Sequence, residues 1–163
     1  MKKRMLCLLS LVCLLLPLAA CGGGTQEKEP ETMGEILLAD FQTQVRKDPK
    51  AAPAALAERL LENPALPFEG MVTPVEPGLL TGFGNIEITG FQEGAMFGPM
   101  IGTIPFVGYV FRLEEGTNGD AFVQILKDNG DLRWNICTEA DQMLVQQEGD
   151  LVFFLMSPVT MEE

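Results

Sequence analysis

The chain has 163 residues, of which 23 are acidic, 11 are basic and none is histidine, so its formal net charge is −12. This length fits one domain of ordinary size together with short terminal segments. The acidic balance argues against nucleic-acid binding, which requires a clustered basic face. The missing histidine removes the commonest general base and the commonest metal ligand.

The first twenty residues have the three-part pattern of a secretory signal peptide. Lys2, Lys3 and Arg4 form a cationic start, residues 5–16 are apolar and uncharged, and Pro17 and small residues follow. The apolar run is too short for a permanent helix across a bilayer, which needs about 20 residues. We therefore expect residues 1–20 to be removed.

Leu18-Ala19-Ala20-Cys21 resembles the lipobox of bacterial lipoprotein precursors. The resemblance implies cleavage after Ala20 and thioether lipidation of Cys21, with acyl chains such as palmitate holding the mature chain on the membrane. Two or more such chains anchor a protein stably, so the domain itself needs no membrane-binding surface. An ordinary secretory signal with a chance cysteine is the alternative. Gly22 replaces the Asp of an inner-membrane retention signal, which fits outer-membrane sorting if the host has two membranes.

Cleavage changes both the charge and the cysteine count of the chain. Losing the three basic residues of the signal leaves 8 basic against 23 acidic residues, a formal charge of −15. Cys7 and Cys13 leave with the signal and Cys21 carries lipid, so Cys137 has no intramolecular partner. Because Cys137 lies near apolar Trp134 and Ile136, we expect a buried thiol without a catalytic role.

The mature chain divides into three parts. Residues 21–31 form a Gly-rich and then polar tether, which we expect to be flexible because it lacks apolar residues to bury. Residues 32–158 form a single domain, and residues 159–163 form an acidic tail.

Two helices are predicted at the start of the domain. Thr32 and Glu35 have the spacing of a capping box, and Leu37, Phe41 and Val45 then form one apolar stripe that ends at Asp48-Pro49. A second helix is predicted to begin near Pro53 and to stop at Asn63-Pro64.

The middle of the chain predicts loops followed by strands. Residues 66–84 are rich in Pro and Gly and predict loops with one short extended piece, whereas Ile86–Phe91 alternates like a half-buried strand. Ala95–Phe111 has seventeen residues without a charge. Its Gly and Pro residues would break a membrane helix, so we expect two buried strands around a turn near Gly102-Thr103, in preference to an exposed inserting loop. Phe106–Leu113 is apolar on both faces, as in a central strand.

The end of the chain predicts a helix and a hairpin. The helix begins at Asn118, with Phe122, Ile125 and Leu126 as its stripe, and ends at Asn129-Gly130. Glu148-Gly149-Asp150 between two apolar runs predicts a tight turn. The predicted fold class is α+β, with two N-terminal helices and one later helix covering one face of a mostly antiparallel sheet that ends in a C-terminal hairpin.

Few residues suggest catalysis or metal binding. The Asn-Gly-Asp triplets at Asn118 and Asn129 do not continue as a calcium loop and are better explained as helix caps and turns. Neither a metal nor a cofactor is therefore predicted. Glu114-Glu115 and Glu139/Asp141 are the carboxylate pairs that could act on a sugar.

The sequence therefore favours a membrane-anchored, extracytoplasmic binding or accessory module and not an enzyme. A carboxylate-dependent hydrolase of a cell-envelope polymer is the alternative. Arg112, Arg133 and Trp134 are candidate binding residues, because Arg and Trp are enriched at binding hot spots. An envelope protein is a candidate partner besides the membrane. The segment from Phe106 to Met156 also resembles small lipoprotein domains of unknown function from Gram-positive bacteria, which assigns no role to any residue.

We expect Cys21 to be the first residue of the mature chain and to carry lipid, because the lipobox follows a correctly proportioned signal. Mass spectrometry of the N-terminal peptide from membranes measures both properties. An unmodified Cys21, or a mature chain that starts elsewhere, would contradict this prediction.

Overall fold

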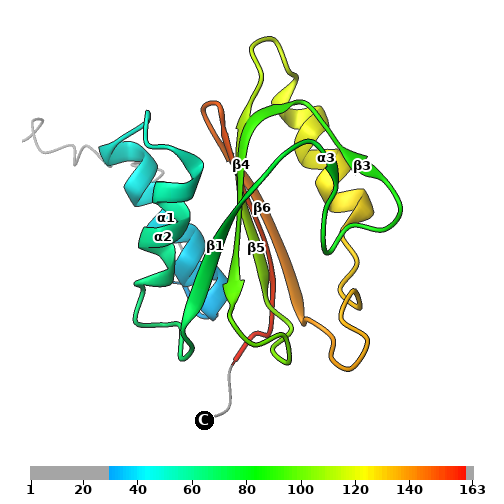
Figure 1. Cartoon of the computed structure of the whole chain (residues 1–163). Helices are drawn as coiled ribbons and strands as arrows, with labels where there is room; N and C mark the ends of the chain where they lie inside the picture. Colours follow the sequence, from blue (N-terminus) through cyan, green and yellow to red (C-terminus); the bar gives the residue numbers. More distant parts are fainter. Residues whose placement is uncertain (1–29, 161–163) are drawn as a thin grey trace, which may run out of the picture.

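The computed structural model describes residues 30–160, which contain helices on both sides of an antiparallel sheet (Figure 1). The predicted signal peptide, most of the predicted tether and the last three residues lie outside the described range. In chain order the elements are α1 (Met33–Lys47), α2 (Pro53–Leu61), β1 (Gly70–Val75), β2 (Gly78–Leu79), β3 (Glu87–Ile88), β4 (Phe91–Pro99), β5 (Val107–Leu113), α3 (Gly119–Asn129), β6 (Gln142–Glu148) and β7 (Leu151–Ser157).

The main sheet has five strands in the order β1-β4-β5-β7-β6, and every neighbouring pair is antiparallel. β2 and β3 form a separate two-stranded ribbon. The C-terminal hairpin is present as predicted, and Gly149 occupies its turn with a φ of 64°, a conformation that favours glycine. The α+β class predicted from the sequence is thus confirmed.

The helix boundaries follow the predicted capping residues. The Glu35 amide donates to Thr32 Oγ1 over 3.1 Å, and the Thr32 amide donates back to Glu35 Oε2 over 3.1 Å, which completes the capping box of α1. Pro53 lies in the first turn of α2. Asn118 caps α3 through its side-chain oxygen, and Gly130 follows the last residue of that helix.

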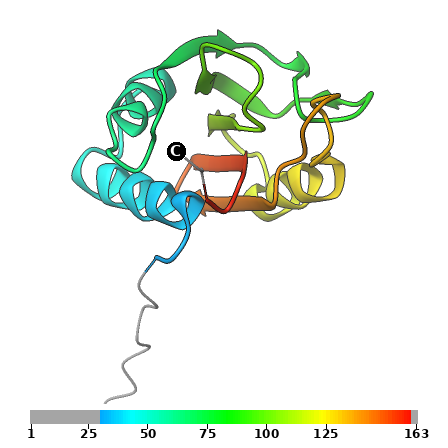
Figure 2. The ribbon, with the colours of Figure 1, turned by 90° about the horizontal axis from the view of Figure 1, so that it is seen from below.

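The helices cover both faces of the sheet, and the prediction that they cover one face is wrong. Alternate residues of β7 belong to different cores: Leu151, Phe153 and Leu155 pack with α1 and α2, whereas Val152, Phe154 and Met156 pack with α3. Figure 2 views the sheet end-on, with α1 and α2 on one side and α3 on the other. A strand that is apolar at every position needs a cover on both faces.

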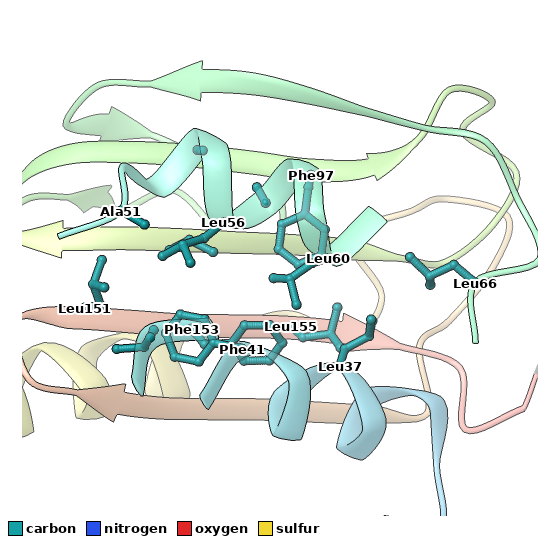
Figure 3. Close-up of a cluster of buried hydrophobic side chains, with 14 of the residues drawn as sticks. Leu37, Phe41, Ala51, Leu56, Leu60, Leu66, Phe97, Leu151, Phe153 and Leu155 are labelled. Carbon is teal, nitrogen blue, oxygen red and sulfur yellow. The ribbon is translucent and has the colours of Figure 1, made fainter. Parts of the chain in front are cut away.

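The first core lies between the sheet and the helix pair α1–α2. Figure 3 shows Leu37 and Phe41 of α1 and Leu60 of α2 directed toward Phe153 and Leu155 of β7. The rings of Phe41 and Phe153 have centroids 5.2 Å apart. The apolar stripe predicted for the first helix is therefore the face that packs on the sheet.

One strand prediction in the middle of the chain is confirmed and one needs correction. β1 is the short extended piece predicted within residues 66–84, and it pairs with β4, where its Pro74 is tolerated because β1 is an edge strand. The strand predicted at Ile86–Phe91 is instead split at Gly90, whose φ is 94°, so that Glu87–Ile88 joins β2 and Phe91 begins β4.

The uncharged segment Ala95–Phe111 is only partly buried. Its strand residues in β4 and β5 belong to the two cores, as predicted. Between the strands, however, Met100 and Ile101 are 64% and 71% exposed. The predicted arrangement of two buried strands around a turn near Gly102-Thr103 is thus confirmed, but the turn exposes apolar side chains because residues 100–106 extend beyond the sheet.

We predict that Gly108→Ala destabilises the domain by about 1–3 kcal/mol, the usual cost of overpacking a core. A Cβ at Gly108 would overlap the ring of Phe97, which is itself held between Phe106 and Phe153. Urea unfolding of the two proteins measures the difference. Gly84→Ala is the matched control, since a Cβ there meets no atom within 4 Å, and equal stability of the two variants would contradict the packing argument.

Candidate functional site

An apolar cleft of about 560 Å³ lies at one end of the main sheet. We call this the cleft end; it is where β4 ends at Pro99, β5 begins at Val107 and β6 begins at Gln142. We call the opposite end, with the β6–β7 turn, the turn end. Apolar side chains dominate the cleft lining: Met71, Met96, Phe97, Pro99, Ile104, Phe106, Val107, Trp134 and Ile136. The side chains that add polar atoms or a thiol are Thr81, Asn135 and Cys137.

Two irregular segments, residues 100–106 and residues 131–141, both contribute to the walls of the cleft. Asn135 Nδ2 donates to the Gly102 carbonyl over 2.8 Å and so joins the two walls. The amide of Ala140 donates to the Leu132 carbonyl over 2.9 Å, which closes the base of the second segment. Trp134 is half-buried, packs against the α3-side core and also lines the cleft.

The buried side chain of Tyr109 holds Thr81, which also lines the cleft. The Tyr109 hydroxyl donates to the Thr81 carbonyl over 2.8 Å, and the Tyr109 ring stacks on Phe111 with centroids 5.3 Å apart. Burial raises the pKa of Tyr109 far above its usual value, although the hydrogen bonds with Thr81 act in the opposite direction. Thr81 is therefore held by a hydroxyl that stays protonated at neutral pH.

The structure separates the three candidate binding residues. Trp134 and Arg133 share the segment 131–141 at the cleft end, and Arg133 is exposed with its Nε 3.5 Å from Glu139 Oε2. Arg112 lies at the turn end of β5, opposite Leu151. Of the three, Trp134 lines the apolar cleft, and Arg133 lies beside it.

Arg112 has a structural role. Its guanidinium forms an ion pair with Asp150 in the hairpin turn, donates to the Ala51 carbonyl over 2.8 Å and lies 3.9 Å from Glu93. These contacts connect β5 with the α1–α2 connection, the hairpin and β4. The prediction that Arg112 contributes to binding gains no support from this environment, because its donors already have partners within the domain.

The four carboxylates of the hydrolase alternative lie at opposite ends of the sheet. Glu114 and Glu115 line a polar hollow at the turn end, beside Asp150, and the described residues that line it include no aromatic side chain. At the cleft end, Glu139 pairs with Arg133, and Asp141 Oδ2 accepts the amide of Val159 over 3.1 Å. Since sugar sites usually stack on aromatic faces, Glu114 and Glu115 do not form a typical glycosidase site. At the cleft end the two carboxylates are engaged by Arg133 and by the Val159 amide.

Cys137 is exposed, so the prediction of a buried thiol is wrong. Apolar neighbours suggested burial, but residues 135–137 belong to an irregular segment in which Ile136 is 99% exposed. The thiol lines the cleft rim, and no imidazole exists in the chain to activate it.

Within residues 30–160, no cluster of three or more Asp, Glu or Cys side chains could hold a metal ion. No helix in that part of the chain combines the length and apolar character required to cross a bilayer. Cys21, the predicted lipidation site, lies outside the described residues. Comparison of the chain with protein-family models, curated proteins and solved structures found no match.

The sequence predicted Trp134 but missed most of the cleft. Met71 lies in a region predicted as loops with one short extended piece, and Met96 and Ile104 lie in the segment predicted as two buried strands around a turn. One sequence signal could have indicated this surface. The large apolar residues Met100 and Ile101 stand directly before Gly102 and Thr103, where a turn is predicted. An apolar turn between two core strands indicates an exposed apolar surface.

We predict that alkaline pH destabilises the domain through Tyr109, the only tyrosine in the chain. Because the pKa of Tyr109 is raised in the folded state, its contribution is complete below the unfolded value of about 10 and is lost as the pH rises above it. The free energy of unfolding should fall there by up to about 1.4 kcal/mol per pH unit. Tyr109→Phe should lack this extra slope. Identical pH profiles would contradict the prediction.

Proposed function

We propose that the protein is a lipid-anchored, extracytoplasmic binding module whose domain holds an apolar group, of the kind found in a lipid acyl chain, in the cleft beside Trp134. The observation that carries this proposal is the lining of the cleft. Binding sites for small molecules typically measure 300–1,000 Å³, are mostly apolar and contain a few placed polar groups. The cleft of about 560 Å³ has this composition, with Thr81 and Asn135 as polar groups.

The lipobox motif at Leu18–Cys21 supports the proposed anchor. A lipid on Cys21 would restrict the domain to the membrane surface and raise its local concentration for ligands and envelope proteins there. Weak binding in the cleft would then suffice. The mature charge of −15 disfavours nucleic acid as a ligand.

Binding is favoured over hydrolysis by the position of the acidic residues. Among the residues that the structure describes, the cleft lining includes no Asp or Glu, whereas the polar hollow that contains Glu114 and Glu115 includes no aromatic side chain. Glycoside hydrolysis requires two carboxylates on either side of the bond that is cleaved. Glu114 and Glu115 thus lie at the opposite end of the sheet from the apolar cleft, and at the cleft end Glu139 is paired with Arg133 outside the cleft lining.

The single tryptophan of the chain makes the proposal testable. Titration with N-phenyl-1-naphthylamine, an uncharged apolar dye, should quench Trp134 emission by energy transfer and give saturable binding. Met71→Gln should weaken dye binding roughly fivefold, because it removes about 1 kcal/mol of apolar contact.

Ile125→Gln is the matched control, since Ile125 is 43% exposed, close to the 47% of Met71, but lies on α3 outside the cleft. This variant should bind the dye like the unchanged protein. Equal effects of the two substitutions, or the absence of saturable binding, would refute the cleft as the binding site. Turnover of a cell-wall polymer that is abolished by Glu114→Gln or Glu139→Gln would instead support the hydrolase alternative.

A further inference from the structure

Three of the four most exposed large apolar side chains in the described part of the chain lie on the two segments that line the cleft. Met100 and Ile101 on the first segment are 64% and 71% exposed, and Ile136 on the second is 99% exposed. The hydrogen bond from Asn135 to Gly102 joins the two segments over 2.8 Å. We call Met100, Ile101 and Ile136 the apolar rim. Apolar groups grouped in this way mark contact with a membrane or with another protein.

The domain also begins at the cleft end. Thr32 Oγ1 donates to Gln142 Oε1 over 3.0 Å at the start of β6, and the amide of Met33 lies 3.5 Å from the Val159 carbonyl just beyond β7. The chain therefore enters the domain at the same end of the sheet as the apolar rim. Figure 2 views the molecule from this end and shows the start of α1 and both wall segments.

The length of chain before the domain limits the distance from the anchor. Residues 21–31 separate the proposed lipid site from Thr32, and even a fully extended chain of eleven residues spans at most about 40 Å. A lipid on Cys21 would thus keep the cleft end close to the bilayer. The turn end, at the opposite end of the strands from the cleft, carries Arg112, Asp150, Glu114 and Glu115.

We propose that the apolar rim docks on the bilayer to which the protein is anchored, so that the cleft opens at the lipid surface. This inference rests on the lipid anchor of the proposed function, because three side chains alone bind a bilayer weakly and need the high local concentration that the anchor provides. It goes beyond the expectation that the domain needs no membrane-binding surface of its own. The rim carries no charge, so uncharged phosphatidylcholine is the appropriate lipid for a test.

Cys137 provides a natural labelling site beside the rim, because it is exposed and adjoins Ile136. The full-length lipidated protein is reconstituted in phosphatidylcholine vesicles, and Cys137 is labelled with the environment-sensitive fluorophore NBD. Nitroxide groups on the lipid acyl chains should quench this label several-fold. The same label on Glu115→Cys in a Cys137→Ser background, at the turn end, should not be quenched.

Substitution of the rim tests the role of its side chains. Met100→Asn/Ile101→Asn should abolish most of the quenching at Cys137. Leu79→Asn should leave the quenching unchanged, because Leu79 is similarly exposed at 68% but lies in the β2–β3 ribbon. Circular dichroism confirms that each variant is folded.

The possible outcomes separate the two proposals. A lipid on Cys21, shown by mass spectrometry, together with equal quenching at the two label positions overturns the docking and leaves the anchor intact. If the Cys137 label is shielded from solvent but is not quenched by nitroxide lipids, the rim contacts a protein and not the bilayer. That result also overturns the docking proposal. An unmodified Cys21 overturns both proposals.

Discussion

The burial of β7 on both faces is the constraint on which the rest of the fold depends. Leu151 to Ser157 are buried without interruption, and their side chains alternate between two separate cores. A strand of this kind needs a neighbour on each edge and a layer on each face. β5 and β6 supply the edges, α1 and α2 cover one face, and α3 covers the other. The antiparallel order and the division of the helices both follow from this requirement.

The same arrangement makes the two ends of the sheet chemically different. At the turn end, Arg112 joins the hairpin to the α1–α2 connection and is surrounded by carboxylates. At the cleft end, the strands continue into two irregular segments that expose the apolar side chains of Met100, Ile101 and Ile136. Exposed apolar groups on such segments have a free-energy cost in water, so their persistence in a strongly acidic chain indicates a use for them.

The sequence predicted those parts of the fold that depend on local chemistry. The Thr32–Glu35 capping box, the Asn118 cap and the Gly149 turn each arise from a few adjacent residues, so their patterns are visible without the fold. The candidate site could be predicted only at Trp134. Met71, Ile104 and Trp134 become neighbours through the β1–β4 pairing and the bond between Asn135 and Gly102. These are long-range contacts that no window of sequence contains.

Cys137 shows why apolar neighbours in the sequence did not predict exposure correctly, since the thiol was expected to be buried and is exposed. Its apolar neighbours indicate burial only if the segment belongs to a regular element, yet the turns at Asp131 and Asn135 direct Ile136 into solvent. The same reasoning applies to Met100 and Ile101, which lie where antiparallel strands reverse direction outside the layers. In both segments apolar side chains are exposed because the backbone has left the sheet. The apolar residues of β7 are buried and stabilise the fold, whereas Ile136 is exposed beside the apolar cleft. Under our proposal, the exposed apolar residues provide a surface for contact with lipid or a ligand.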